Sequence, residues 1–172
     1  MSSNLVGLLN RIHAVNTEIA DVANSDLTLS PRRYFPVSKD ISFMPIIAPL
    51  VPSGQHDATV FGGDELHSVW SIPIWVWVDK FNAGSSPNTA QANTEPVIDH
   101  LLSEYWKRPR LELENETVTE YSTESAGAFN CILSDARLNT NSTLQSLTID
   151  GANVAVVQFT LTVETTNDFE RI

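Results

Sequence analysis

The chain has 172 residues, a formal net charge of −11 and a single cysteine, Cys131. That length favours one domain with a sizeable buried core, and one cysteine excludes an internal disulfide and a cysteine-based metal cluster. Residues 111–172 carry two basic and ten acidic side chains, −8 of the −11, so tight nucleic-acid binding is disfavoured because phosphate contacts need basic side chains.

The first predicted element is an amphipathic helix over residues 5–22. Apolar side chains recur at three- and four-residue steps from Leu5 to Val22, which places them in one stripe. Ser3 or Asn4 is the expected N-cap. The segment is too polar for a signal peptide or a membrane span, and its polar face lacks the positive charge of a membrane-surface helix. We therefore expect this helix to pack on a sheet, with no membrane contact.

The next stretch predicts a connector, an extended segment and a long loop. Residues 24–40, "NSDLTLSPRRYFPVSKD", are typical of a connector, and "ISFMPIIAPLVP" then reads as extended. Pro45 and Pro49 cannot donate ladder hydrogen bonds, so this segment is expected at a sheet edge or only partly paired. Residues 53–68, "SGQHDATVFGGDELHS", contain three glycines and predict a long loop or arm, a feature that is usually functional or disordered.

The segment "VWSIPIWVWVDKF", residues 69–81, predicts a strand that is apolar on both faces. With a period of two, one face carries Trp70, Ile72, Ile74, Val76 and Val78, and the other carries Val69, Ser71, Pro73, Trp75 and Trp77. Such a strand needs cover on both sides. The second cover is either the chain's own elements or a neighbouring subunit. The proline in the middle predicts an edge position or a bulge.

A second helix is predicted from Thr94, with Pro96 in its first turn and an apolar stripe that ends near Tyr105. Strands should follow in "LELENETVTEY", "FNCIL" and "LTI", and the last strand is "ANVAVVQFTLTVE". Asp150-Gly151 is a two-residue hairpin signal. The sequence thus predicts an α+β fold, a mostly antiparallel β-sheet flanked by two α-helices on one face, in a single domain over residues 1–172.

Motifs for chemistry are scarce. The sequence has no glycine-rich phosphate loop, nucleophile elbow or HExxH zinc motif. His56, Asp57, Asp64, Glu65 and His67 offer ligand types for a divalent cation, but their spacing matches no known ligand pattern. Cys131 lies in an apolar strand and is expected to be a buried small hydrophobe rather than a nucleophile. We therefore expect no enzymatic activity, metal or cofactor.

Two short basic clusters stand out against the acidic background. Arg32 and Arg33 precede Tyr34, and Lys107, Arg108 and Arg110 follow the second helix. Both are too thin for a nucleic-acid surface and fit docking points for an acidic partner surface, such as the C-terminal region of a neighbouring copy. The alternating Glu112, Glu114 and Glu116 predict a solvated face, or the lining of a central opening if the chain forms a ring.

The order of elements resembles that of a known family. An amphipathic helix leads to "ISFMPIIAPLVP", a long loop, the apolar strand "WSIPIWVWV", the helix "EPVIDHLLSEYW" and the closing strand "VAVVQFTLTVET". This layout resembles the tail-terminator and head–tail joining (tail completion) proteins of tailed bacteriophages. The resemblance implies an α+β structural virion protein, assembled in the host cytoplasm into a ring, typically a hexamer, at the head-proximal end of the tail. Such a ring stops tail-tube polymerisation and joins the tail to the neck.

The resemblance also implies partners and surfaces. The partners are further copies of the chain, the tail-tube protein, a neck or connector protein and, in a contractile tail, the sheath, while DNA passes through the lumen without being specifically bound. The candidate subunit-interface residues are Trp75, Trp77, Arg32, Arg33 and Phe61, the last from the 53–68 loop that is expected to reach the tail tube or a neighbour. Glu112, Glu114 and Glu116 are the lumen-facing candidates.

Three alternatives remain open from the sequence. The chain is another neck or tail component, such as a stopper, a baseplate piece or a tube subunit that polymerises by itself. Alternatively it is a metal- or ligand-binding domain that uses the His56–His67 loop. A carbohydrate- or protein-binding module with exposed tryptophans is the third possibility.

Overall fold

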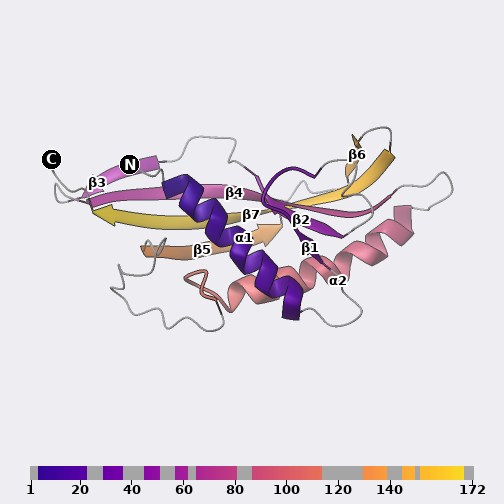
Figure 1. Ribbon diagram of the computed structural model, residues 1–172, viewed down its shortest axis with the longest axis horizontal. Coiled ribbons are helices and arrows are strands. Elements are labelled where there is room, and N and C mark those ends of the chain that lie inside the picture. The colour runs from indigo at the N-terminus through magenta and orange to yellow at the C-terminus, as the bar shows by residue number, and fades with distance from the viewer. Residues whose placement is uncertain are drawn as a thin grey trace.

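The computed structural model describes residues 4–22, 29–36, 45–50, 57–61, 65–80, 87–113, 130–138, 145–149 and 152–168. In chain order the elements are α1 (Asn4–Val22), β1 (Ser30–Pro31), β2 (Ile46–Pro49), β3 (Asp57–Phe61), β4 (Glu65–Lys80), α2 (Pro87–Trp106), β5 (Asn130–Leu138), β6 (Gln145–Ile149) and β7 (Ala152–Asp168). The strands form one seven-stranded sheet (Figure 1). The predicted α+β fold is confirmed.

A long β4–β7 pairing forms the axis of the sheet. The strand order is β1-β2-β4-β7-β5, with β3 also pairing with β4 and β6 with β7. Among the described strands, β1 and β2 pair in parallel and the other pairs are antiparallel. Figure 1 shows β3 at one end of this ribbon and β6 at the other. Ile149 pairs with Ala152, so the strands on either side of Asp150-Gly151 are joined as the hairpin signal predicts.

Both helices pack on the same face of the sheet. The main core cluster combines buried side chains of α1, α2, β4 and β7, namely Leu8, Leu9, Ile12, Val15, Ile19, Val97, Ile98, Leu101, Tyr105, Trp70, Ile72, Ile74, Val76, Val157, Phe159, Leu161 and Val163. These are the stripes and alternating positions that the sequence assigns to the core, because helix and strand periods place them on one side. The prediction of two helices on one face is confirmed.

The face without helices carries a second, smaller core. Trp77 is buried there with Ile46, Ala48, Val154 and Val156, and Trp75 is packed against them. Further along β4 the same face becomes polar, where Ser71 is exposed. The predicted two-sided burial of β4 is therefore confirmed at the end that holds the tryptophans.

Pro73 is neither at an edge nor at a bulge, which corrects the prediction. β4 is a central strand and its register shift lies between Trp77 and Asp79. The carbonyl of Pro73 accepts a hydrogen bond from the amide of Leu50 at 3.0 Å. The N and C=O of one residue point to the same neighbour in an antiparallel strand. The backbone N of Pro73 therefore points toward the β2 and β3 side of β4. On that side, β3 pairs only as far as Val69 and β2 pairs only from Ile74. The hydrogen bonds between β4 and β7 are therefore unaffected by the proline.

The two prolines in and just before β2 are also placed where their missing N–H does not face β4. Pro45 and Ile47 accept hydrogen bonds from the amides of Ser30 and Arg32, both at 2.8 Å. Pro45, Ile47 and Pro49 therefore direct their backbone groups toward β1, and the ladder with β4 uses the residues between them. β2 is not the outermost strand, but its pairing with β1 covers only two residues. The prediction of partial pairing is confirmed, and the reason is the missing N–H at alternate positions.

The predicted loop over residues 53–68 is wrong where the structure describes it. Residues 57–61 form β3, and residues 65–68 open β4, with Phe61 paired to Glu65. The two strands pair as a hairpin where the sequence predicted an irregular loop. The alternation in "DATVF" was the available signal, but it is short and follows a polar stretch.

Two further boundaries differ from the prediction. α2 begins at Pro87, well before Thr94, so Pro96 lies inside the helix, where its ring removes one backbone hydrogen bond. Residues 111–113 are not a strand. Leu111 has a φ of 53° and is fully buried, and its carbonyl accepts a 2.7 Å hydrogen bond from Arg11 Nε. The turn after α2 is thus fixed by tertiary contacts rather than by local alternation.

Candidate subunit interface

The segment 29–36 joins the two faces of the sheet at its β1 edge. Leu29 is buried in the helix-side core. Six residues later, the Phe35 ring lies against Trp75 and Trp77 on the face without helices. The predicted connector therefore wraps the sheet edge and delivers an aromatic ring to the far side.

Phe35, Trp75 and Trp77 form an aromatic patch on the helix-free face. The Phe35 ring centroid lies 5.4 Å from that of Trp77, edge to face, and 6.3 Å from that of Trp75, and the two indoles are 5.7 Å apart. Such tilted arrangements favour the ring quadrupoles. Trp77 is fully buried, whereas 49% of Phe35 is exposed. The patch is thus a buried indole with a partly open aromatic cover. Both tryptophans were predicted as contact residues from the sequence, whereas Phe35 was not.

Arg33 precedes Phe35 by two residues and is held by neutral groups. Its Nε donates a 2.8 Å hydrogen bond to Asn10 Oδ1 of α1, and its guanidinium carbon lies 5.0 Å from the Tyr34 ring centroid. Tyr34 is 74% exposed. Arg32 Nη1 donates to the Pro31 carbonyl at 3.0 Å. Because neither partner of Arg33 is a carboxylate, its positive charge is left uncompensated among the described residues.

The pKa of His13 is affected by burial and by the positive charges of Arg33 and Arg32. Burial lowers its pKa, and the charges of Arg33 and Arg32 lower it further, against a hydrogen bond with the backbone of Arg32 that favours the protonated form. His13 lies one helical turn from Asn10 on α1. The charges of the two arginines therefore act on a residue of α1.

Trp77 also carries an unpaired donor. Its Nε1 is buried and has no hydrogen-bond partner in the part of the chain that the structure describes. Trp70 differs, since its Nε1 donates to Thr165 Oγ1 across the β4–β7 pair at 2.9 Å. A buried donor without an acceptor costs about 1–3 kcal/mol. Trp77 is therefore retained for its ring contacts and not for its N–H.

The other predicted interface and lumen residues do not join the aromatic patch. Phe61 pairs with Glu65, twelve residues from Trp77 along β4. Glu112 is half-buried and accepts a 3.0 Å hydrogen bond from the amide of Arg110. Glu114 and Glu116 lie outside the described residues. The structure thus brings Trp75 and Trp77 together, places Arg33 against Asn10 of α1, and gives Phe61 and Glu112 other partners.

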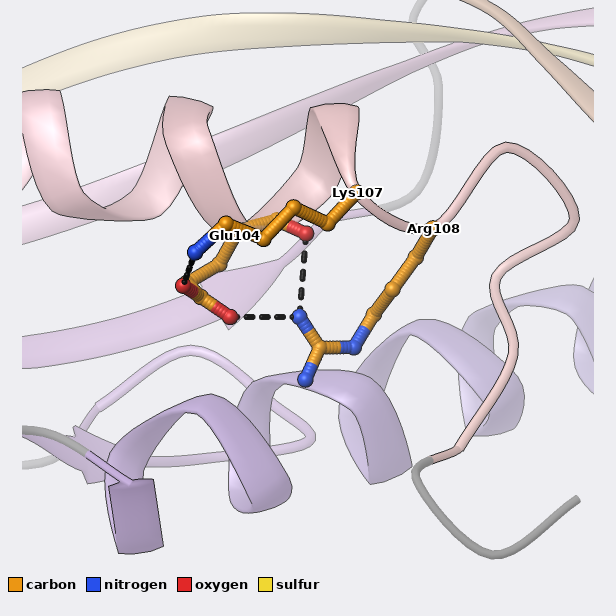
Figure 2. A network of polar contacts seen from close by, with 3 residues as sticks. All are labelled: Glu104, Lys107 and Arg108. Carbon is orange, nitrogen blue, oxygen red and sulfur yellow. Dashed lines mark hydrogen bonds and ion pairs between the residues drawn. The ribbon is translucent and has the colours of Figure 1, made fainter.

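The second basic cluster is engaged within the chain. Figure 2 shows Lys107 and Arg108 at the end of α2, both directed to the Glu104 carboxylate. Lys107 Nζ lies 2.5 Å from Oε1, and Arg108 Nη1 lies 2.7 Å from Oε2 and 3.0 Å from the Glu104 carbonyl. These cations neutralise a carboxylate and satisfy a helix-terminal carbonyl. This arrangement makes them poorer docking points for an acidic partner than the sequence suggested.

We expect Glu104→Gln to lower the free energy of unfolding at pH 7 by about 1–3 kcal/mol, because two cations lose their charged partner in a site that is only 10% exposed at the Glu104 side chain. Burial alone raises the pKa of Glu104, but the hydrogen bonds of Arg108 and Lys107 outweigh it and lower the pKa. The stabilisation is therefore present above the ordinary glutamate pKa and is lost as pH falls through the folded-state value.

Urea unfolding of wild type and Glu104→Gln between pH 7 and pH 2 checks this expectation. The two curves should converge at low pH. Asp99→Asn, an exposed change on the same helix, is the matched control and should stay within about 0.5 kcal/mol of wild type. A Glu104→Gln variant as stable as wild type at pH 7 contradicts a stabilising network.

Three of the residues considered for a metal site lie in strands that the structure describes. Asp57 lies in β3, and Glu65 and His67 lie in β4. Among the described residues, no group of three histidine, cysteine or acidic side chains is arranged to hold a metal ion. His56 and Asp64 are outside those residues, and so is the burial of Cys131.

Neither described helix combines the length and apolarity needed to cross a membrane. A scan against protein-family models and a search of curated proteins each find no match. What the chain does must therefore be inferred from its own residues, and the aromatic patch is the feature that most resembles a site of contact.

Proposed function

We propose that this chain is a structural virion protein of a tailed phage, which assembles into a ring at the head-proximal end of the tail. In that position it ends polymerisation of the tail tube and joins the tail to the neck. DNA passes through the ring without being specifically bound, which suits a chain of net charge −11. The order of helices and strands resembles that of tail-terminator proteins, and this layout is what directs the proposal to that family.

The aromatic patch is the observation that supports self-assembly of the chain. Aromatic residues and arginine are enriched in the energetically dominant parts of protein interfaces. Here a half-exposed Phe35 and a partly buried Trp75 lie on the sheet face that the helices leave open, and Arg33 and an exposed Tyr34 directly precede Phe35 in the chain. A subunit of a ring needs such a surface, whereas an enzyme needs convergent titratable groups, and the described residues offer the former.

Native mass spectrometry and negative-stain imaging over a range of protein concentrations test the proposal. We expect closed rings of one stoichiometry that do not grow into tubes. The variant Phe35→Ala/Trp75→Ala should lose the rings while remaining folded by circular dichroism. Trp106→Ala removes an equally exposed aromatic from the end of α2, where 56% of Trp106 is exposed, and should leave the rings intact.

The other outcomes separate the rival functions. Open-ended tubes of wild type indicate a tube subunit and contradict a terminator. Rings that survive Phe35→Ala/Trp75→Ala but not Trp106→Ala place the contact on the other side of the molecule. A wild-type protein that is monomeric at every concentration contradicts ring formation by this chain alone.

A further inference from the structure

Residues 29–36, which we call the edge segment, connect the two faces of the sheet. Leu29 is buried in the helix-side core, and six residues later the Phe35 ring packs edge to face on Trp77. Between these two anchors the edge segment is attached to β2 by backbone hydrogen bonds and to α1 by side-chain contacts. The position of Phe35 over the aromatic patch therefore depends on those attachments.

The attachment of the edge segment to β2 is short. The amide of Ser30 donates to the Pro45 carbonyl at 2.8 Å, and the pairing of β1 with β2 covers two residues. The amide of Arg32 donates to the Ile47 carbonyl, also at 2.8 Å. Segments held by so few backbone hydrogen bonds open locally at a low free energy, before the rest of the sheet. The contacts with α1 therefore matter for keeping the edge segment in place.

Two residues one turn apart on α1 supply these contacts. Asn10 Oδ1 accepts a 2.8 Å hydrogen bond from Arg33 Nε, and the His13 ring is hydrogen-bonded to the backbone of Arg32. The Nδ1 atom of His13 is buried and has no hydrogen-bond partner in the described part of the chain, so the bond to Arg32 uses Nε2. Because this bond favours the protonated form, Nε2–H donates and the Arg32 carbonyl accepts.

A second proton on the His13 ring is unfavourable while the edge segment is attached. Burial lowers the pKa of His13 most strongly, and the charges of Arg33 and Arg32 lower it further. That proton would sit on Nδ1 and turn it into a buried donor without an acceptor among the described residues. Release of the segment removes the arginines and admits water, so it relieves both penalties.

The elements packed around His13 bring no compensating negative charge among the described residues. The strands β1 and β2, which lie against α1, consist of uncharged residues. On α2, Tyr105 contacts this stretch of α1 through Asn16, and burial raises the pKa of Tyr105 so that it is neutral in acid. The other charged residues of α1 with described side chains lie two and five positions from His13, on other faces of the helix: Arg11 and Glu18.

We infer that His13 is a pH-sensitive switch: when neutral it holds the edge segment on α1, and when protonated it releases the segment together with the Phe35 cover of Trp77. The released form binds the extra proton more tightly, so acid shifts the equilibrium toward it. Since the folded-state pKa lies below the ordinary value of about 6.5, the hold is fully present above that pH. It is lost as the pH falls through the folded-state value. The switch acts within one chain and does not depend on ring assembly.

Amide hydrogen exchange of the wild type as a function of pH tests the switch. After correction for intrinsic exchange rates, protection of the Ser30 and Arg32 amides should fall between pH 7 and pH 4.5. The expected loss is about tenfold for each unit by which the pKa of His13 is depressed. Amides of the β4–β7 ladder should stay protected, which separates release of the segment from unfolding of the sheet. Tryptophan emission should shift to longer wavelength over the same range, because Phe35 no longer covers Trp77.

NMR titration of the His13 ring in the wild type gives a second measurement that needs no substitution. Its midpoint should lie below the ordinary histidine pKa and coincide with the loss of protection. A midpoint at or above the ordinary value, protection that is constant over this pH range, or protection lost without an emission shift would each overturn the inference.

Three variants, each checked for folding by circular dichroism, assign the effect to His13. His13→Gln keeps a donor for the Arg32 carbonyl but does not titrate, so its protection should be independent of pH in this range. Arg33→Gln removes one repelling charge and should move the midpoint to higher pH. His100→Gln removes a histidine of α2 and should show the wild-type profile. A folded His13→Gln variant with the wild-type profile, or a His100→Gln variant that abolishes it, contradicts the assignment.

Discussion

Trp77→Ala is expected to lower the free energy of unfolding by about 3–5 kcal/mol, the usual cost of truncating a fully buried large aromatic residue. Trp77 is fully buried and contacts both Trp75 and Phe35. Its loss removes the base of the aromatic patch, and the neighbouring side chains can collapse only partly into the space. Urea unfolding followed by circular dichroism measures the change, because tryptophan fluorescence is itself altered by the substitution.

Trp77→Phe is the matched variant, and it should stay within about 1 kcal/mol of wild type. The smaller ring loses some packing, but it also removes the buried Nε1 that has no acceptor among the described residues, a gain of about 1–3 kcal/mol. A loss above about 2 kcal/mol for Trp77→Phe would mean that the N–H is hydrogen-bonded in solution. The ring contacts would then not be the main reason for a tryptophan at this position.

Tyr105→Phe should lower the free energy of unfolding by about 1–3 kcal/mol, although only one oxygen atom is removed. The Tyr105 hydroxyl donates a 2.5 Å hydrogen bond to Asn16 Oδ1 between the two helices, and both residues are fully buried. Asn16 Nδ2 already lacks a partner among the described residues. Without the hydroxyl, the amide oxygen is also buried without a donor, and its desolvation is no longer compensated.

A double-mutant cycle isolates this bond. In Asn16→Leu the buried tyrosine hydroxyl loses its hydrogen-bond partner. The double variant Asn16→Leu/Tyr105→Phe removes both members of the bond. It should therefore be more stable than the sum of the two single-variant losses predicts. The ring that remains in Tyr105→Phe keeps the contact with Phe159, whose centroid lies 5.9 Å from that of Tyr105. Simple additivity of the two changes would contradict a direct hydrogen bond in solution.

The buried hydroxyl of Tyr105 should make the folded protein less stable at high pH. Burial raises the pKa of Tyr105 well above its ordinary value, against the opposing charge of Arg108. The unfolded state therefore releases its proton from about pH 10 upward while the folded state keeps it, and stability falls as pH rises through that window, by up to about 1.4 kcal/mol per pH unit. This component of the slope should be absent from Tyr105→Phe.

Several elements of the fold could be predicted because their signals are local. The stripe of α1, the alternation in β4 and β7 and the Asp150-Gly151 hairpin each depend on residues close in the chain, and the structure confirms them. The β3 hairpin and the long start of α2 were missed. Both segments are polar or short, and local propensity is too weak a signal there to predict a strand or a helix.

The candidate subunit interface could also be predicted only in part from the sequence. The sequence pointed to Trp75 and Trp77 because a strand apolar on both faces needs a second cover. It gave no sign that Phe35 is part of that cover, since forty residues separate Phe35 from Trp75 and only the wrapping of the sheet edge brings them together. Lys107 and Arg108 looked like free cations in sequence, and only folding placed both on Glu104.

What the sequence determined by itself is therefore the fold class, the core-facing side of α1, α2, β4 and β7, and the uneven distribution of charge. Periodicity and composition are properties of neighbouring residues, so they can be read without coordinates. The tertiary structure decided which charges are neutralised, which proline N positions face no partner, and which aromatic rings meet. Those outcomes depend on strand register and on contacts between distant segments, which no local pattern encodes.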